Sequence, residues 1–446
     1  MEQVDTLIYA RWIIPVEPYN VAHDNHCLAI RDGRIADILP AEEAKQKYNG
    51  DVVLNLENHA LMPGLINTHT HVAMSLFRGL ADDLPLMEWL NGHIWPAEGK
   101  WVSPKFVHDG TRLAMAEMLL GGTTCFNDMY FFPDETARAA AEVHMRATVG
   151  MILIDFPTIW AANADEYISK GLKLHDEYRN HPLINMAFAP HAPYTVSNSP
   201  LEKVQTLSEE LEIPVHMHVH ETEHEVNESI EQHQARPLER LNTLGLLSPN
   251  LLAVHMTQLT DDEISTLAET GVSVIHCPES NLKLASGFCP IAKLIDAGIN
   301  VALGTDGAAS NNDLDMFGEM RTAALTAKAV SKDASAVPAA TALKMATLNG
   351  AKALGIDHET GSLETGKAAD IIAIDLSAIE CQPIYHPISQ LVYATGRDKV
   401  SDVWVSGKHL VKGGTLTNMD TATIVKHAQA WGEKIIAADQ SHQSKD

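Results

Sequence analysis

Two histidines, His69 and His71, stand two positions apart at the end of the apolar segment LMPGLINTHTH. In a β-strand, residues i and i+2 point to the same face, so both imidazoles would face one site. Neutral imidazole is a common ligand of Zn²⁺ and of other transition metals. The chain has 23 histidines, and random placement yields about one such pair in a chain of this composition, so the pair alone is weak evidence for a metal.

A second histidine cluster occurs in the segment HMHVHETEHE, where His216, His218 and His220 alternate on one face of an expected strand. The spacing alone does not choose a metal ligand among the three, and a buried structural histidine fits each position as well. Glu221 follows directly at the end of the expected strand. A carboxylate there could reach a water molecule bound to a metal.

Two more apolar runs end on side chains that can bind a metal or move a proton. LLAVHMT carries His255, and VALGTDG carries Asp306. Four separate expected strands therefore bring suitable groups to one rim. Nitrogen and oxygen ligands with one open position are typical of a catalytic rather than a structural Zn²⁺ or Fe²⁺ site.

The elements that position these residues follow a repeating pattern. After Pro63, apolar strand-like runs alternate with amphipathic helical stretches such as SPKFVHDGTRLAMAEMLLGG, which has a Ser-Pro start and a Gly-Gly stop. Eight such units predict a closed (β/α)8 barrel, whose catalytic groups lie at the carboxyl ends of the strands. The eight runs end near LINTH, TTCFND, ATVGMILID, NMAFAPH, IPVHMHVHE, LLAVHMT, GVSVIHCP and NVALGTDG.

Both ends of the chain have a different, β-rich texture. The first 60 residues contain short extended segments, with Asp32-Gly33 as a hairpin signal, and Ser406-Gly407 marks a second hairpin near the other end. We therefore expect one small β-sandwich side domain that is built from both termini. The expected domains are residues 1–60 (first part of the sandwich), 61–368 (barrel) and 369–446 (second part and a C-terminal helix).

The composition and charge of the chain make nucleic acid and membranes unexpected as binding partners. Of 446 residues, 58 are acidic and 32 are basic, so a nucleic acid backbone would be repelled over most of the surface. The N-terminus has no basic segment followed by an apolar core, and no run approaches the roughly 18 apolar residues of a membrane span. We expect a cytoplasmic protein that binds neither nucleic acid nor membrane. The five cysteines form no CxxC pair and are expected to be reduced packing residues.

Several motifs together resemble the signature of the amidohydrolase superfamily, in its metal-dependent deaminase and chlorohydrolase branch. These are PGLINTHTH, HMHVHE, AVHMT and LGTDGAASNN, and the resemblance extends to ATLNGAKALGI and GSLETGKAADIIAID. MEWLNGHIWPAEGKWV and PHAPYT are most similar to the 5-methylthioadenosine/S-adenosylhomocysteine deaminases. The resemblance implies a homo-oligomeric hydrolase that converts a purine nucleoside into its inosine analogue and ammonia.

The resemblance also implies roles for individual residues. One divalent metal ion, Zn²⁺, would be bound by His69, His71, His218 and Asp306. The family's HxxE pattern fits His218 with Glu221, which leaves His216 and His220 as structural residues. Glu221 would carry protons. His255 would orient the attacking hydroxide, and Asp306 would accept a hydrogen bond or a proton from it. NMAFAPH contains no lysine, so the carbamylated bridge of binuclear relatives cannot form there.

Substrate contacts are implied in the same way. Glu98 would accept hydrogen bonds from two ribose hydroxyls, His191 would contact the substrate, and Trp89 would form a wall of the pocket. Glu221 and Asp306 would touch the purine as well as the nucleophile.

The segment GMILIDFPTIWAAN, residues 150–163, has no arginine to pair with an amino-acid carboxylate. Its apolar residues, Phe156, Ile159 and Trp160, suit a thiomethyl group better. We therefore expect 5′-methylthioadenosine, with adenosine as a second substrate, over S-adenosylhomocysteine. Arg146 is the nearest residue that could rescue binding of that substrate.

Two other functions stay open at this point. Related barrels with the same ligands act on guanine, cytosine or s-triazines, and an inactive barrel could serve as a scaffold. Cytidine-deaminase, Rossmann and P-loop motifs are absent from the sequence, which does not favour these other enzyme classes.

Overall fold

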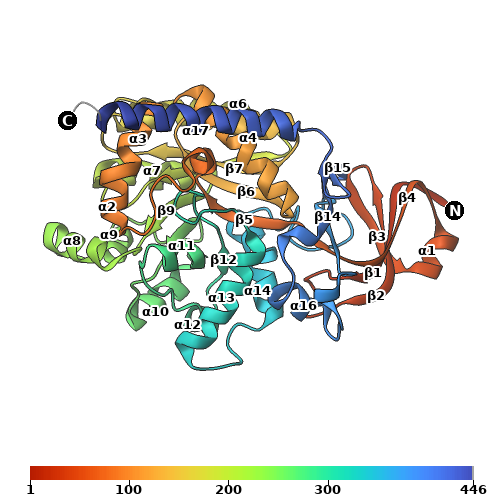
Figure 1. The fold of residues 1–446 in the computed structure, drawn as a ribbon. Helices are drawn as coiled ribbons and strands as arrows, with labels where there is room; N and C mark the ends of the chain where they lie inside the picture. Colours follow the sequence, from red (N-terminus) through yellow and green to blue (C-terminus); the bar gives the residue numbers. More distant parts are fainter. Residues whose placement is uncertain (444–446) are drawn as a thin grey trace.

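The computed structural model describes the backbone of residues 1–443 and the side chains of residues 1–437. Its centre is a barrel of eight parallel strands that follow one another in chain order, with helices around the outside (Figure 1). Each of the eight predicted runs forms one of these strands, which confirms the predicted fold. The strands are β5 (Leu65–Thr70), β6 (Thr123–Tyr130), β7 (Arg146–Leu153), β8 (Ile184–Pro190), β9 (Val215–Val219), β10 (Leu251–His255), β11 (Ser273–His276) and β12 (Val301–Leu303).

The barrel closes between its shortest strand, β12, and β5. The Thr68 hydroxyl donates a hydrogen bond of 2.6 Å to the carbonyl oxygen of Leu303. Beyond the end of β12, the Asp306 amide donates to the carbonyl oxygen of His69 at 3.0 Å. The closing contacts therefore place Asp306 beside the histidine pair of β5.

The longer helices of the outer ring carry recognisable start and stop signals. Helix α4 begins after Ser103, whose hydroxyl accepts from the Phe106 amide at 3.3 Å, as expected of an N-cap. It ends before Gly121 and Gly122, and Gly122 has a φ of +86°, a conformation that favours glycine. The ring comprises α4 (Pro104–Leu120), α5 (Pro133–Val143), α6 (Ala164–Tyr178), α7 (Asn198–Leu211), α8 (Glu223–His233), α9 (Pro237–Thr243), α10 (Asp261–Thr270), α11 (Pro278–Lys283), α12 (Ile291–Asp296), α13 (Met316–Ser331), α14 (Ala339–Met345) and α15 (Leu348–Ala353).

A helical insertion between β5 and α4 covers one side of the rim. It consists of η1 (Val72–Phe77), α2 (Leu86–Trp89), η2 (Leu90–Ile94) and α3 (Trp95–Trp101). Its apolar side chains form a separate core cluster with Phe106 of α4. This cluster holds the insertion against the barrel.

The side domain is built from both ends of the chain, as predicted. Its strands form a mixed sheet in the order β16-β15-β14-β13-β4-β1-β2-β3. The turns Asp32-Gly33 and Ser406-Gly407 have positive φ at both positions, as two-residue hairpins require. The strands of the side domain are β1 (Glu2–Ile13), β2 (His23–Arg31), β3 (Arg34–Pro40), β4 (Tyr48–Pro63), β13 (Ile371–Asp375), β14 (Val400–Val405), β15 (Lys408–Lys412) and β16 (Thr415–Leu416), with helix α1 (Ala41–Lys47) between β3 and β4. Between β13 and β14 the chain forms η3 (Ile379–Cys381), α16 (Pro387–Tyr393) and η4 (Arg397–Lys399), and α16 packs against α13 and α14 of the barrel.

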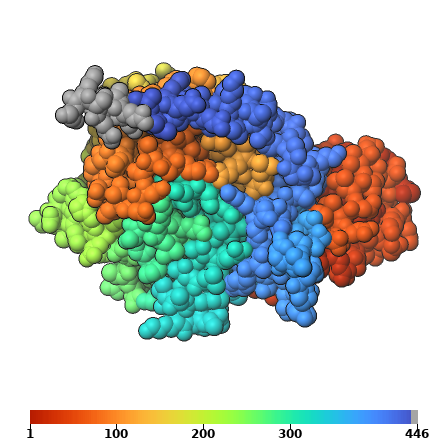
Figure 2. Space-filling model, viewed as in Figure 1, coloured from red at the N-terminus to blue at the C-terminus, as the bar shows by residue number. Residues whose placement is uncertain are grey.

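The two hairpin turns of this sheet lie against each other, so the sheet curls around a shared core. A Cβ atom added to Gly407 would lie 2.7 Å from the Cα of Gly33. Apolar residues of β1, β2, β13 and β14 fill the core, including the fully buried Trp404. In the space-filling view, the red N-terminal residues lie beside blue residues of the later part of the chain at this end of the molecule (Figure 2).

Gly64 connects the side domain directly to the barrel. Strand β4 runs to Pro63 and β5 starts at Leu65, and a Cβ on Gly64 would lie 2.0 Å from Oγ1 of Thr124. The predicted division at residues 60 and 368 stays a prediction, and β4 continues across the first of these positions.

The last helix, α17 (Thr421–Gln443), returns to the barrel and lies across it (Figure 1). Its Trp431 side chain donates a hydrogen bond of 2.9 Å to Asp109 of α4. Across the described chain, no helix combines the length and apolar character that a bilayer crossing needs. All five cysteines are buried and free, as expected.

Candidate active site

Four metal-binding side chains meet at the carboxyl ends of β5, β9 and β12. His69, His71, His218 and Asp306 each direct one donor atom into a space where all four atoms lie within 4.8 Å of one another. Oδ1 of Asp306 is 3.3 Å from Nε2 of His69 and 3.2 Å from Nε2 of His71. The structure therefore brings together all four residues that the sequence suggests as ligands.

Outer contacts fix the ring orientation of two of these histidines. Nδ1 of His71 lies 2.6 Å from the carbonyl oxygen of Met129, and Nδ1 of His218 lies 2.7 Å from that of His191. Because a carbonyl oxygen only accepts hydrogen bonds, each Nδ1 must carry the proton. In the neutral ring, each Nε2 then presents a lone pair to the site, as a metal ligand requires.

The other two histidines of the β9 cluster have different surroundings. Nε2 of His216 lies 2.8 Å from Nδ1 of His69, on the side of that ring away from the ligand cluster. His220 accepts a hydrogen bond from the Leu238 amide at 3.3 Å. His216 thus supports a ligand and His220 supports a neighbouring turn, in line with the structural roles expected for both.

Asp306 is held by hydrogen bonds from neighbouring residues and lies beside the two histidines of β5. Ser280 and Ser310 donate to its Oδ2 at 2.6 and 2.8 Å, which leaves Oδ1 toward the histidines. Burial raises the pKa of this carboxyl, but the neighbouring imidazoles of His69 and His71 outweigh burial and hold the pKa well below its usual range. Asp306 therefore faces the site as a carboxylate.

Glu221 and His255 lie next to the ligand cluster. Nε2 of His255 is 3.8 Å from a carboxylate oxygen of Glu221, and Nδ1 of His255 is 2.8 Å from Oδ1 of Asn281. Since an amide oxygen accepts, His255 donates from Nδ1 and presents Nε2 as an acceptor. Burial raises the pKa of Glu221, which brings its proton exchange closer to neutral pH.

Three residues of this rim have strained backbones. The φ angles are +54° at His220, +76° at His255 and +63° at Asp306, although none is glycine. Such conformations cost about 1–3 kcal/mol each and persist where the surrounding structure enforces them, often at functional sites.

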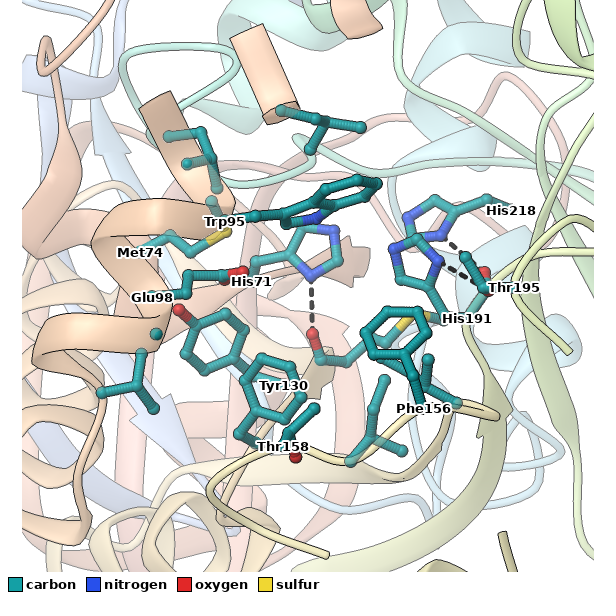
Figure 3. A pocket seen from close by; sticks show the side chains of 18 of the residues that line it. His71, Met74, Trp95, Glu98, Tyr130, Phe156, Thr158, His191, Thr195 and His218 are labelled. Atoms are coloured by element: carbon teal, nitrogen blue, oxygen red, sulfur yellow. Dashed lines mark hydrogen bonds between the residues drawn. The ribbon is translucent and has the colours of Figure 1, made fainter. Parts of the chain in front are cut away.

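A cavity of about 540 Å³ opens above the ligand cluster. Trp89, Glu98 and His191, the three substrate contacts suggested by the sequence, all line it together with Glu221 and His255. Figure 3 shows Glu98 on the same side as His71, with Phe156 near His191 on the other side. The structure thus places the expected metal, proton-transfer and substrate residues around one cavity.

Glu98 and His191 on the cavity wall also have shifted pKa values. Burial raises the pKa of Glu98 to about 7, and Tyr130 and His71 reduce this shift. Burial, together with the neighbouring His71 and His69, lowers the pKa of His191 to about 3. His191 is therefore a neutral hydrogen-bonding group at physiological pH.

Comparison with known proteins places this geometry in a family. Residues 60–410 match the amidohydrolase family. The chain belongs to the amidohydrolase family. It is 53% identical over 433 residues to 5-methylthioadenosine/S-adenosylhomocysteine deaminase of Saccharophagus degradans, with 97% of each chain covered. The deaminase of the same name from Aquifex aeolicus is 42% identical, with 92% of this chain and 94% of that protein covered.

Solved structures agree with the amidohydrolase assignment. An adenosine deaminase from Xanthomonas campestris with bound zinc has a TM-score of 0.97 and 53% identity, covering 98% of this chain and 99% of that chain. The atrazine chlorohydrolase of Arthrobacter aurescens, at 24% identity and a TM-score of 0.89, shares the fold.

The outer walls of this amidohydrolase cavity are apolar. They come from the helical insertion, through residues such as Leu90 and Trp95, and from the segment after β7, through Ile154, Phe156 and Ile159. Among the described residues that line the cavity, none is a lysine or an arginine. One expectation is wrong here: Trp160 lies outside the lining, because its ring packs against Phe132 with 5.2 Å between ring centroids.

Sequence reasoning missed several site residues of this amidohydrolase. Tyr130 and Thr195 line the cavity, and Ser280, Asn281 and Ser310 hold Asp306 and His255. Tyr130 follows the pattern used for the other residues, because it is the last residue of a barrel strand. Ser280 and Asn281 come from the short helix α11, and Ser310 comes from the turn after Asp306. None of the three lies in a barrel strand, so the strand pattern does not mark them.

Proposed function

We propose that this amidohydrolase is a hydrolytic deaminase of purine nucleosides that converts 5′-methylthioadenosine into its inosine analogue and ammonia. The observation that carries the proposal is the convergence of His69, His71, His218 and Asp306 within 4.8 Å at the floor of a cavity, with Glu221 and His255 beside them. The names of the relatives in Saccharophagus degradans and Aquifex aeolicus support the same reaction.

The donor set fits one zinc ion. Three imidazoles and one carboxylate, without a thiolate, are typical of catalytic zinc sites, and the fixed Nε2 lone pairs of His71 and His218 suit that ion. When bound, the metal supplies a water nucleophile at neutral pH, because coordination lowers the pKa of water from about 15.7 to about 7. The zinc-containing Xanthomonas campestris structure supports this choice of metal.

Glu221 is the proposed proton carrier. Its carboxyl delivers a proton to ring N1, which makes C6 electrophilic enough for water to add. The Glu221 carboxylate takes a proton from the water as it adds and passes it to the amino group at C6, which leaves as ammonia when the C6–N bond breaks. The added hydroxyl returns its remaining proton to Glu221, so the acid is restored and the oxygen becomes the carbonyl of the product. His255, through Nε2, and Asp306 accept hydrogen bonds from the attacking water.

The sugar and base are held by the cavity wall. Glu98 has two carboxylate oxygens and accepts hydrogen bonds from two ribose hydroxyls in the proposed complex. Neutral His191 lies between the ligand histidine His218 and Thr195, where it contacts the nucleoside. Trp89 closes the apolar wall on the side of the helical insertion.

The proposed preference for a thiomethyl group over an amino acid rests on the lack of positively charged side chains in the described cavity lining. An S-adenosylhomocysteine carboxylate would enter a cavity whose described lining offers no lysine or arginine. Arg146, the residue that could rescue this substrate, is buried at the other end of β7 and donates to Asp370 at 2.8 Å. The apolar side chains of Phe156 and Ile159 line the cavity mouth instead.

The experiment is a 265 nm absorbance assay of the zinc-loaded protein against 5′-methylthioadenosine, S-adenosylhomocysteine, adenosine, guanine, cytosine and an aminated s-triazine. We expect the highest kcat/KM for 5′-methylthioadenosine. Equal kcat/KM for S-adenosylhomocysteine would refute the substrate preference. Turnover of only guanine, cytosine or the triazine would replace the proposed reaction, and protein without bound zinc or turnover would favour a scaffold.

We also propose that the enzyme is a homo-oligomer in the cytoplasm. The support is the family resemblance for the first statement and the composition for the second. Light scattering coupled to size-exclusion chromatography tests the subunit number, and cell fractionation tests the location.

A further inference from the structure

A second glutamate, Glu225, holds the turn that carries Glu221. Glu225 lies in the first turn of α8 and is only 4% exposed. Its Oε1 accepts a hydrogen bond from the His220 amide at 3.0 Å, and its Oε2 accepts one from the Glu221 amide at 2.7 Å. One carboxylate therefore binds two successive backbone amides of the turn.

The turn needs such support. His220 has a φ of +54°, a conformation that relaxes unless neighbouring contacts enforce it. On the opposite side, the Thr257 hydroxyl donates to the carbonyl oxygen of Glu221 at 2.7 Å. Glu225 and Thr257 thus fix both the amide and the carbonyl of the residue that we assign as proton carrier.

Helix capping alone does not explain Glu225. Helix α10 has an ordinary capping box, in which Glu263 reaches back to the amide of the N-cap residue Thr260 at 2.9 Å. In α8 the N-cap is Thr222, whose hydroxyl accepts from the Glu225 amide at 3.3 Å. The Glu225 carboxylate nevertheless reaches beyond Thr222 to the two preceding residues.

We propose that Glu225 is a positioning residue, which sets the orientation of Glu221 for proton transfer. This inference rests on the proposed deaminase function. Glutamine at position 225 would keep the size of the side chain, but its amide NH2 would face one of the two backbone N–H groups. One hydrogen bond would then become a donor–donor contact, and the turn would relax. A displacement of about 1 Å at a reacting group can cost about 10²-fold in rate.

The first test compares Glu225→Gln with two matched controls in the zinc-loaded enzyme. We expect kcat for 5′-methylthioadenosine to fall by about 10- to 100-fold, with KM changed less than about 3-fold and one equivalent of zinc retained. Glu223→Gln removes an exposed acid from the same helical turn and should keep wild-type kcat. Thr260→Ala removes the N-cap side chain of α10, which breaks its capping box, and should lower the melting temperature without lowering kcat.

The second test asks whether Glu225 acts through Glu221. In the Glu221→Gln background, the positioned carboxylate is already absent, so Glu225→Gln should lower kcat by less than about 3-fold. An equal loss in both backgrounds would overturn the inference, as would wild-type kcat or loss of zinc in Glu225→Gln. Should that variant be insoluble, Glu225→Asp replaces it: the shorter acid cannot span both amides, and wild-type kcat would again overturn the inference.

The outcomes separate the two proposals. A zinc-loaded wild-type enzyme that releases no ammonia from any purine nucleoside would refute the proposed function. If the wild-type enzyme is active, the Glu221→Gln variant is impaired and the Glu225→Gln variant keeps the wild-type kcat, only the role of Glu225 is refuted.

Discussion

Both ends of the barrel bury ionisable side chains, but these side chains have different partners at the two ends. At the carboxyl end of the strands, His69, His71, His218 and Asp306 converge on a space that opens to a cavity. At the amino end, Arg146 of β7 pairs with Asp370 at 2.8 Å, and both side chains are almost fully buried.

The hydrogen bonds of the amino-end pair are completed within the protein. Arg146 also lies 3.2 Å from the Ser406 hydroxyl, and the Ser406 amide donates to Asp370 at 2.7 Å. These bonds join β7 to the β14–β15 turn of the side domain. The difference shows that a buried charge paired by protein groups joins two parts of the fold, whereas buried groups directed toward a shared empty centre form a site.

The largest effect is expected from Asp306→Ala. This change removes a ligand and also the carboxylate that accepts from the attacking water, so activity should fall by at least about 10⁴-fold as the nucleophile is lost. Zinc content, measured by atomic absorption, should drop well below one equivalent. Full zinc occupancy with near wild-type ammonia release would contradict the assignment of Asp306.

Glu221→Gln should separate chemistry from metal binding. The amide cannot shuttle protons, so kcat should fall by about 10²–10⁴-fold. Zinc should stay at one equivalent, because Glu221 lies outside the four-ligand group. The 265 nm assay and metal analysis of the same sample check both statements. Loss of zinc would indicate that Glu221 is itself a metal ligand.

Asp370→Asn tests the other end of the barrel. Breaking a buried ion pair leaves the Arg146 charge poorly compensated, so the free energy of unfolding should fall by about 3–5 kcal/mol. The folded enzyme should keep its kcat. Urea denaturation followed by circular dichroism measures the change.

The matched control is Arg34→Gln, which removes the exposed ion pair between Arg34 and Glu359. It should cost less than about 1 kcal/mol. Equal destabilisation by the two substitutions would remove the distinction between the buried and the exposed pair.

The sequence predicts the carboxyl end of the barrel well because strand ends are marked by apolar runs. His69, His255 and Asp306 each lie at or just after such a run, and all barrel strands meet at one rim. The spacing of the histidines does not show that His218 rather than His216 is the metal ligand. That assignment required the family resemblance, and in the structure His216 contacts the far side of His69.

The remaining contacts could not be predicted from the strand pattern, because they come from segments outside the barrel strands or from distant partners. Ser280 and Ser310 both reach Asp306 although 30 residues of sequence separate them. The φ of +76° at His255 has no glycine to signal it. Arg146 stands in an apolar strand, where only the distant partner Asp370 explains its burial.

A smaller effect is expected at the cavity mouth from Phe156→Arg. Phe156 lines the cavity and is 45% exposed, so a guanidinium there can pair with an amino-acid carboxylate and remain hydrated. We expect kcat/KM for S-adenosylhomocysteine to rise by about 10-fold and that for 5′-methylthioadenosine to fall by less. Phe156→Met, which adds no charge, should change neither value by more than about 3-fold, and an equal gain in that variant would exclude ion pairing.

The smallest effect concerns the pH dependence of sugar binding by Glu98. Burial raises its pKa from the ordinary 4.5 to about 7, so Glu98 is ionised above pH 7 and protonated below it. A protonated carboxyl accepts hydrogen bonds from the ribose hydroxyls less well. KM for adenosine should therefore rise as the pH falls from 8 to 6, by up to about 10-fold. In Glu98→Gln, KM should be higher and constant over this range; a wild-type KM that is constant from pH 8 to 6 would show that Glu98 does not bind the sugar as a carboxylate.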